Sequence, residues 1–320
     1  MSRTISNAKE LSGVFIALFT PLKNDDSKNL YNSIDYKKAE KMIDDLVDAG
    51  VSGIVSVGTT GQSATLTTHQ HVDFIKFTFD YVGERLPVIA GAGSNCTRET
   101  IETVNIVQKT VGKITCLCVT GYYNNPPQKG LVKHYETVTA ETGAKIILYN
   151  VPSRTNSYLE PDTVMHLSEN KNIIGLKQAV DFVTPGKMRE DTLKIVQNVD
   201  SEKFTLVTGE DDALFAILKM GGKGIITATG NIPEAARLFC DIIKNFNSGK
   251  HDKAEDLQKQ VLPFVKACFI RKNPIPLATL FNSPIYKPLI SVKETEGGEE
   301  VYLKLIELVN SSATSLKKYF

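Results

Sequence analysis

One lysine interrupts an otherwise apolar run near the middle of the chain, Ile174-Gly-Leu-Lys-Gln-Ala-Val180. The run is short and continuously apolar, which predicts a strand buried on both faces. A charged ammonium is costly in such a dry interior, whereas a desolvated lysine amine is the nucleophile that forms a Schiff base with a ketone. Lys177 could instead extend its ammonium from the strand end to water. Taken alone, this residue leaves both interpretations open.

A tyrosine near the end of the preceding apolar run strengthens the catalytic interpretation. Tyr149 lies in Lys145-Ile-Ile-Leu-Tyr-Asn-Val-Pro152, and neighbouring strands lie about 4.8 Å apart. A phenol beside an amine can move protons while a carbinolamine loses its hydroxyl group. A buried tyrosine that only donates one hydrogen bond is the alternative.

Three further polar motifs follow predicted strands. Gly58-Thr-Thr-Gly61 places two hydroxyls between glycines, which suits a carboxylate-binding turn, although a plain tight turn also explains it. Gly121-Tyr-Tyr-Asn-Asn-Pro-Pro127 places two phenols in a loop. Arg154 follows Tyr149 closely and could bind a second carboxylate with two hydrogen bonds.

The elements that must position these residues alternate between strands and helices. Eight apolar segments read as buried strands: residues 13–22, 53–60, 86–93, 113–121, 145–152, 173–180, 204–210 and 224–231. Amphipathic stretches separate them, and eight such units predict a parallel TIM (β/α)8 barrel. A doubly wound sheet is disfavoured because Gly91-Ala-Gly93 lacks the third glycine of a dinucleotide fingerprint. We expect a barrel domain over residues 10–235 and a helical C-terminal appendage over residues 236–320.

Composition narrows the class of protein. The 320 residues are 42% hydrophobic, and 37 Lys and Arg balance 36 Asp and Glu, which gives no global field for nucleic acid or an anionic membrane. The five cysteines are scattered and odd in number, so we expect neither a metal site nor disulfides. No leader-like or membrane-spanning stretch stands out, and we expect a cytoplasmic protein.

In combination these motifs resemble the dihydrodipicolinate synthase and N-acetylneuraminate lyase family. The shared motifs are GVFIALFTPL, SVGTTGQSATLT, VIAGAGSN, GYYNNPPQKG, YNVPSRT, GLKQA, TGEDD and NPIP. The resemblance implies that Lys177 is the Schiff-base lysine and Tyr149 the general acid and base. It implies a proton relay through Thr59 and Tyr123, with Tyr123 reaching the active site of a partner subunit. It assigns substrate binding to Thr59, Thr60, Arg154, Gly209, Glu210 and Ile226.

The resemblance also implies a reaction. A pyruvate enamine on the lysine would condense with L-aspartate 4-semialdehyde to give 4-hydroxy-tetrahydrodipicolinate, with no metal or organic cofactor, in a tight dimer or a tetramer. Ser153-Arg154-Thr155 favours this synthase over the alternatives, a 2-keto-3-deoxy sugar acid aldolase or an N-acetylneuraminate lyase. A non-catalytic barrel that senses an oxo acid is disfavoured by the intact lysine, tyrosine and threonine set. Gly209-Glu-Asp-Asp212 could also be only a capped helix start.

A second set of residues matches the positions that bind L-lysine in feedback-inhibited members: Ser63, Ala64, His71, Asn95, Glu99 and Tyr122. The alternative is a first-turn helix carboxylate at Glu99 and a surface histidine at His71. The chain departs from the family pattern at several positions. Gln62 and Gln178 stand where glutamate is common, and Thr68 stands where histidine is common. Leu277 and Ala278 follow the NPIP motif where a lysine is common. Residues 181–203 form a longer connection than is usual.

Overall fold

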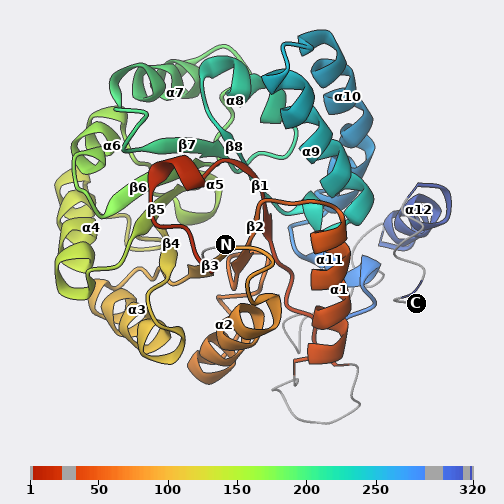
Figure 1. The fold of residues 1–320 in the computed structure, drawn as a ribbon, viewed down its shortest axis with the longest axis horizontal. Coiled ribbons are helices and arrows are strands. Elements are labelled where there is room, and N and C mark those ends of the chain that lie inside the picture. The colour runs from red at the N-terminus through yellow and green to blue at the C-terminus, as the bar shows by residue number, and fades with distance from the viewer. Residues whose placement is uncertain (1–2, 24–33, 285–297, 313–317, 319–320) are drawn as a thin grey trace.

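The computed structural model describes residues 3–23, 34–284, 298–312 and 318. Eight parallel strands pair in chain order and close into a barrel, with a ring of helices outside (Figure 1). The TIM barrel predicted from the sequence is therefore confirmed. The strands are β1 (Gly13–Ala17), β2 (Gly53–Ser56), β3 (Val88–Gly91), β4 (Thr115–Val119), β5 (Ile146–Asn150), β6 (Ile173–Gln178), β7 (Thr205–Thr208) and β8 (Gly224–Thr227).

The outer helices lie between successive strands, except for the last of them, which follows β8. They are α1 (Tyr36–Asp48), α2 (Thr68–Val82), α3 (Thr97–Val111), α4 (Gln128–Thr142), α5 (Pro152–Thr155), α6 (Pro161–Ser168), α7 (Lys187–Asn198), α8 (Leu214–Met220) and α9 (Pro233–Asn247). In α2, the stripe of Val72, Ile75, Phe79 and Val82 expected from its spacing is buried. Helix α9 contacts α8, α1 and β1. The domain boundary expected between residues 235 and 236 falls in its first turn.

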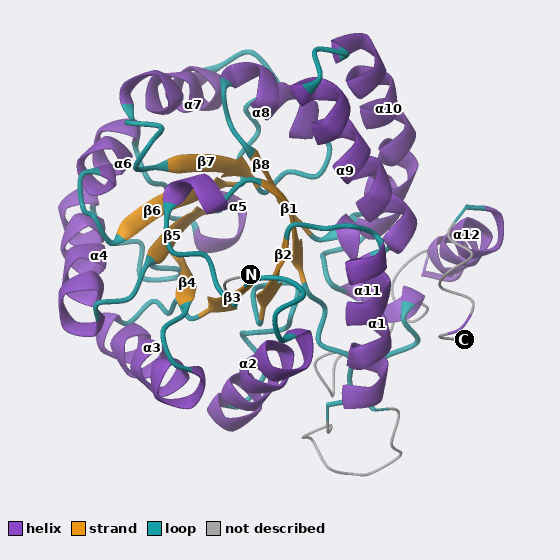
Figure 2. Cartoon of the chain, viewed as in Figure 1, coloured by secondary structure: helices purple, strands orange, loops and turns teal. Residues whose placement is uncertain are grey.

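Among the described residues, the barrel is followed by the helices α10 (His251–Cys268), α11 (Ile275–Leu280) and α12 (Gly298–Ser311). Helix α10 packs on α9, and α12 contacts α10 and α11. These helices lie at one side of the barrel (Figure 2), which confirms the helical appendage. Within the described ranges, no helix has both the length and the apolar character needed to cross a membrane.

The N-terminal segment closes the amino end of the barrel. Ile5 and Leu11 join the apolar cluster inside the barrel, and the chain passes in front of the strands near the barrel axis (Figure 1). The Thr4 hydroxyl donates to the Val88 carbonyl at 2.8 Å, and the Thr205 hydroxyl donates to the Ala8 carbonyl at 2.7 Å. Because this end is plugged, the carboxyl ends of the strands are left to form a site.

Several strands are shorter than expected from the sequence. The apolar run at residues 53–60 predicted a strand through Thr60, but β2 ends at Ser56. The next residue, Val57, has a φ of 55°, which takes the backbone out of the extended region. Apolar composition therefore located the strand but not the turn that ends it.

Candidate active site

Lys177 and Tyr149 lie side by side at the carboxyl ends of β6 and β5. They are direct partners in the strand register, as expected from adjacent strands in a barrel. Each is only 7% exposed, and Lys177 Nζ lies 4.4 Å from the centroid of the Tyr149 ring. The lysine therefore does not extend to water. The structure places the buried amino group of Lys177 beside the ring of a phenol, an arrangement that Schiff-base chemistry can use.

Apolar side chains and one glycine surround this lysine. Val207 is its register partner on β7, and Val207, Ile226 and Tyr149 belong to the apolar cluster inside the barrel. A Cβ atom on Gly209 would lie 2.7 Å from Lys177 Cε. Only glycine leaves room for the present path of the lysine side chain.

Two carboxyl groups follow β7 beside the lysine. Burial, together with the neighbouring charges of Asp211 and Asp212, raises the pKa of Glu210 to about 7, and the charge of Lys177 opposes this rise. Asp211 is 2% exposed, and burial raises the pKa of its carboxyl group. The Thr229 N–H donates to Asp211 Oδ2 at 2.7 Å. This carboxyl group therefore ties the end of β7 to the turn after β8.

The cap interpretation of Gly209-Glu-Asp-Asp212 is wrong for α8. The N-cap residue of that helix is Ala213, and no side chain caps it. The sequence did not predict that Asp211 is buried and binds the backbone of Thr229. Three consecutive acids directly after an apolar strand were the available signal, because charged residues inside a barrel need a partner.

The Gly58–Gly61 turn and Arg154 are linked through one distant residue. Asn273 lies between α10 and α11, and its Nδ2 donates to Thr60 Oγ1 at 3.0 Å. Arg154 Nη2 donates to the Asn273 carbonyl at 2.9 Å. Asn273 Oδ1 is buried, and no hydrogen-bond partner for it is found among the described residues. Asn273 thus connects the expected binding positions for two carboxylates, a link that the sequence did not predict.

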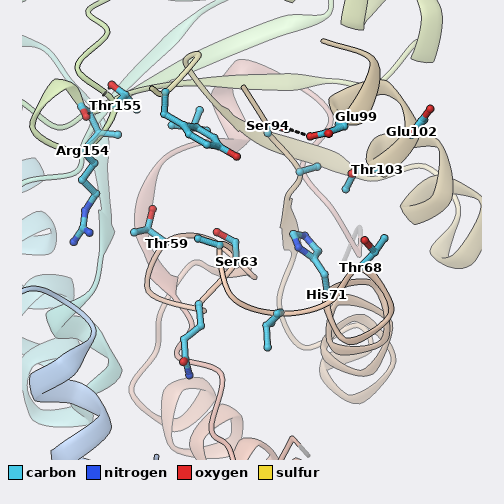
Figure 3. Close-up of a pocket in the computed structure, with 18 of the residues that line it drawn as sticks. Thr59, Ser63, Thr68, His71, Ser94, Glu99, Glu102, Thr103, Arg154 and Thr155 are labelled. Carbon is cyan, nitrogen blue, oxygen red and sulfur yellow. Dashed lines mark hydrogen bonds between the residues drawn. The ribbon is translucent and has the colours of Figure 1, made fainter. Parts of the chain in front are cut away.

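A cavity of about 560 Å³ opens beside this turn (Figure 3). Arg154 and Thr155 lie at one side of it, and Glu99 and Glu102 lie at the other. Five of the six residues expected to bind L-lysine line this cavity together with Thr59: Ser63, Ala64, His71, Glu99 and Tyr122. The sixth, Asn95, donates from Nδ2 to the Tyr122 carbonyl at 3.0 Å. The expected regulatory residues and part of the expected catalytic set therefore share one cavity.

His71 is not the surface histidine of the alternative interpretation. Its Nε2 lies 2.7 Å from the Gly91 carbonyl, which can only accept, so the proton is on Nε2 and Nδ1 is free to accept. Burial lowers the pKa of this imidazole. A smaller cavity of about 40 Å³ is lined by His71, Thr59 and Tyr149. Glu99 Oε2 accepts a hydrogen bond from Ser94 Oγ at 2.7 Å (Figure 3).

No group of three or more histidine, cysteine, aspartate or glutamate side chains within residues 3–23, 34–284, 298–312 and 318 is arranged to hold a metal ion. All five cysteines are free thiols.

The model of the dihydrodipicolinate synthetase family matches residues 10–298. The chain belongs to this family. Relatives from Methanocaldococcus jannaschii and Methanococcus vannielii, both named 4-hydroxy-tetrahydrodipicolinate synthase, are each 38% identical to it. The first alignment covers 84% of this chain and 87% of the relative, and the second covers 85% and 88%.

Solved structures of family members share the fold. Dihydrodipicolinate synthase from Aquifex aeolicus is 30% identical, with a TM-score of 0.81 over 94% of this chain and 97% of that chain. The enzyme from Thermotoga maritima is 28% identical, with a TM-score of 0.82 over 93% of this chain and 98% of that chain. The family resemblance drawn from the motifs is thereby confirmed.

One residue of the proton relay expected from the resemblance lies apart from the others in this chain. Tyr123 is 95% exposed and has a φ of 72°. Its side chain does not join Lys177, Tyr149 and Thr59 within the same chain. An exposed aromatic in a loop is a candidate for contact with another molecule.

The departures from the family pattern lie around the site without removing its chemistry. Gln178 is buried; its Oε1 accepts from Asn150 Nδ2 at 2.9 Å, and its Nε2 donates to Thr192 Oγ1 at 3.1 Å. Leu277 and Ala278 are buried in α11, and Thr68 lines the cavity (Figure 3). The long connection at residues 181–203 contains a bend, in which Asp181 accepts from the Thr184 N–H, followed by α7.

Proposed function

We propose that the protein condenses pyruvate with L-aspartate 4-semialdehyde to form 4-hydroxy-tetrahydrodipicolinate, through a Schiff base on Lys177. The observation that carries this proposal is the buried Lys177 amine 4.4 Å from the ring of Tyr149. The names of relatives that align over most of the chain support the choice of substrates.

The reaction begins with the Lys177 amine attacking C2 of pyruvate. Tyr149 passes a proton to the departing C2 hydroxyl, water leaves, and a protonated imine forms. Loss of a proton from the methyl group then gives an enamine, whose carbon attacks the aldehyde. The amino group of the second substrate displaces the lysine and closes the ring, which frees the enzyme. The lysine acts as the electron sink, so we propose that no metal or organic cofactor takes part.

The remaining residues are assigned to substrate binding in this proposal. Thr59 and Thr60 hold the pyruvate carboxylate, and Arg154, fixed by its bond to the Asn273 carbonyl, binds the carboxylate of the aldehyde. Gly209, Glu210 and Ile226 complete the wall around Lys177. Thr59 and the Tyr123 of a second copy complete the proton relay, which makes a dimer or larger homo-oligomer the active form. We place this reaction in the cytoplasm.

Borohydride trapping tests the central step. Incubation with pyruvate and borohydride should attach a reduced pyruvyl group to Lys177, and Lys177→Ala should remain unlabelled when each protein is digested and sequenced by mass spectrometry. A coupled assay with aspartate semialdehyde or a sugar aldehyde then identifies the second substrate. An adduct on a different lysine, or the absence of an adduct, would overturn the proposal.

We also propose that L-lysine inhibits the enzyme by binding in the cavity of about 560 Å³. Glu99 can pair with an ammonium group, and His71 Nδ1 can accept a hydrogen bond from one. Thr59 lines the same cavity, and Tyr122, which also lines it, adjoins the relay residue Tyr123, so an occupant could disturb the relay. Thr68 replaces a common histidine, so we expect weaker inhibition than is usual. Equal inhibition of wild type and Glu99→Ala, or none up to millimolar lysine, would contradict this assignment.

A further inference from the structure

The turn assigned to the pyruvate carboxylate is flanked by two strained residues. Val57 precedes Gly58 with a φ of 55°, and Gln62 follows Gly61 with a φ of 64°. Side chains with a Cβ rarely adopt this left-handed conformation, and a β-branched residue such as valine does so least. Such a conformation persists only where the surrounding structure holds it. The contacts that hold this turn therefore determine where its hydroxyls point.

A reciprocal pair of hydrogen bonds fastens the turn to the segment that follows β1. The Thr20 hydroxyl donates to the Gly61 carbonyl at 2.7 Å, and Gln62 Nε2 donates to the Thr20 carbonyl at 2.8 Å. Thr20 is 0% exposed and Gln62 is 1% exposed, so water cannot replace either donor. Gly61 itself fits closely, because a Cβ atom there would lie 2.9 Å from the Leu18 carbonyl.

The chemistry of the pair requires a donor at position 62. A backbone carbonyl only accepts, so the Gln62 atom that faces the Thr20 carbonyl must be its NH2 group. The family resemblance implies a glutamate at this position, and a carboxyl group can make this bond only while it holds its proton. Ionised, it would place a buried negative charge against a carbonyl oxygen and near the substrate carboxylate.

We propose that Gln62 is a positioning residue that locks the Gly58–Gly61 turn for binding pyruvate, and that its amide makes this lock independent of pH. The proposal rests on the proposed function, in which Thr59 and Thr60 of this turn hold the pyruvate carboxylate. Gln62 acts through the backbone of the turn and through Thr20.

Other ionisable groups face the same cavity and must be separated from any effect at position 62. They come from α2, α3, the loop after β4 and α5: His71, Glu99, Glu102, Tyr122 and Arg154. Wild type and variants carry all of them. The ratio of variant to wild-type activity at each pH therefore isolates the group at position 62.

The test compares two exchanges of a buried amide for a carboxyl group. In Gln62→Glu one oxygen of the new group faces the Thr20 carbonyl, which cannot donate. In Gln178→Glu one oxygen accepts from Asn150 Nδ2, and the other faces the Thr192 hydroxyl, which can rotate away from the Met188 carbonyl to donate to it. Both variants and wild type are assayed with varied pyruvate from about pH 6 to about pH 9.5, the range in which a buried carboxyl group titrates.

For Gln62→Glu we expect kcat/KM for pyruvate near that of wild type at the acid end and at least about tenfold lower at the alkaline end, mostly through KM. The ratio for Gln178→Glu should stay flat. Gln62→Met removes the donor without adding a charge and should raise KM for pyruvate by about tenfold at every pH. This variant also serves if Gln62→Glu fails to fold.

The results show separately whether the positioning role of Gln62 fails and whether the proposed function fails. If borohydride traps pyruvate on wild-type Lys177 but the Gln62→Glu ratio stays flat, or Gln62→Met keeps the wild-type KM, the positioning role is wrong and the proposed function stands. If wild type traps no pyruvate, the proposed function fails and this inference fails with it. If the ratio of variant to wild-type kcat/KM changes with pH for Gln62→Glu alone, the result supports the positioning role of Gln62.

Discussion

Replacing Gly209 with alanine should displace the side chain of Lys177 while the protein stays folded. The added Cβ would lie 2.7 Å from Lys177 Cε, 3.3 Å from Lys177 Cγ and 2.8 Å from the Cβ of Ala179. Non-bonded carbon atoms are most favourably placed about 3.5 to 4.0 Å apart. The end of the lysine side chain must therefore move by about 1 Å, and the backbone at Ala179 must shift slightly as well, because a Cβ atom moves only with its backbone.

A displacement of about 1 Å at a reacting group can reduce the rate by about 100-fold. We expect Gly209→Ala to lower kcat by about that factor and to slow borohydride trapping on Lys177. Overpacking should reduce the free energy of unfolding by only about 1 to 3 kcal/mol, so the protein stays folded.

Steady-state kinetics, trapping rates and denaturant unfolding measure these effects separately. Gly130→Ala in α4 is the matched control, because the nearest atom to its added Cβ is 3.3 Å away and belongs to the side chain of Pro126. That variant should keep kcat near the wild-type value. A wild-type kcat in folded Gly209→Ala would refute the claim that this glycine sets the path of the catalytic lysine.

Three further substitutions test other parts of the site. Tyr149→Phe keeps the ring beside Lys177 but removes the phenol, and should lower kcat by about 100-fold to 10,000-fold in the coupled assay; a loss under tenfold would exclude a proton-transfer role. Arg154→Ala should lower kcat/KM for aspartate semialdehyde by about 30-fold to 150-fold while pyruvate trapping continues, and an unchanged value would contradict the assignment. Glu210 has a pKa of about 7 in the fold against an ordinary value of 4.5, so the folded state binds more protons between these values and stability falls as pH rises through them. Denaturant unfolding of Glu210→Gln should therefore show it to be more stable than wild type above about pH 7, by up to about 3 kcal/mol; equal stability at all pH values would show that the carboxyl group is not desolvated.

The pairing of Lys177 with Tyr149 could be predicted because it depends only on local information. Each residue lies in a short apolar run, and consecutive runs separated by a helix become adjacent parallel strands. The strand register then places both side chains at the same end of the barrel, as observed. The overall fold could be predicted for the same reason, since eight repeated units leave few ways to pair the strands.

The contacts that fix the site could not be predicted in this way. Asn273 reaches Thr60 across 213 positions of sequence, and Gln62 reaches Thr20 across 42. Neither pair shows a periodic pattern, because each consists of one donor and one acceptor brought together by the closed barrel. The sequence showed that Asn273 begins the NPIP motif and that Gln62 differs from the glutamate expected after Gly58-Thr-Thr-Gly61. It could not show which atoms these two side chains bind.

These long-range contacts connect the C-terminal helices to the candidate active site. Asn273 comes from the loop between α10 and α11 and bonds to both the Gly58–Gly61 turn and Arg154. Gln258 of α10 accepts a hydrogen bond from the Phe215 N–H at the start of α8, next to the segment that carries Glu210. Both walls of the mouth around Lys177 are thus fastened to the same appendage. Because Asn273 anchors Arg154 while Thr20 and Gln62 also fasten the Gly58–Gly61 turn, a barrel without its C-terminal helices should keep the nucleophile and this turn but lose the contact that fixes Arg154.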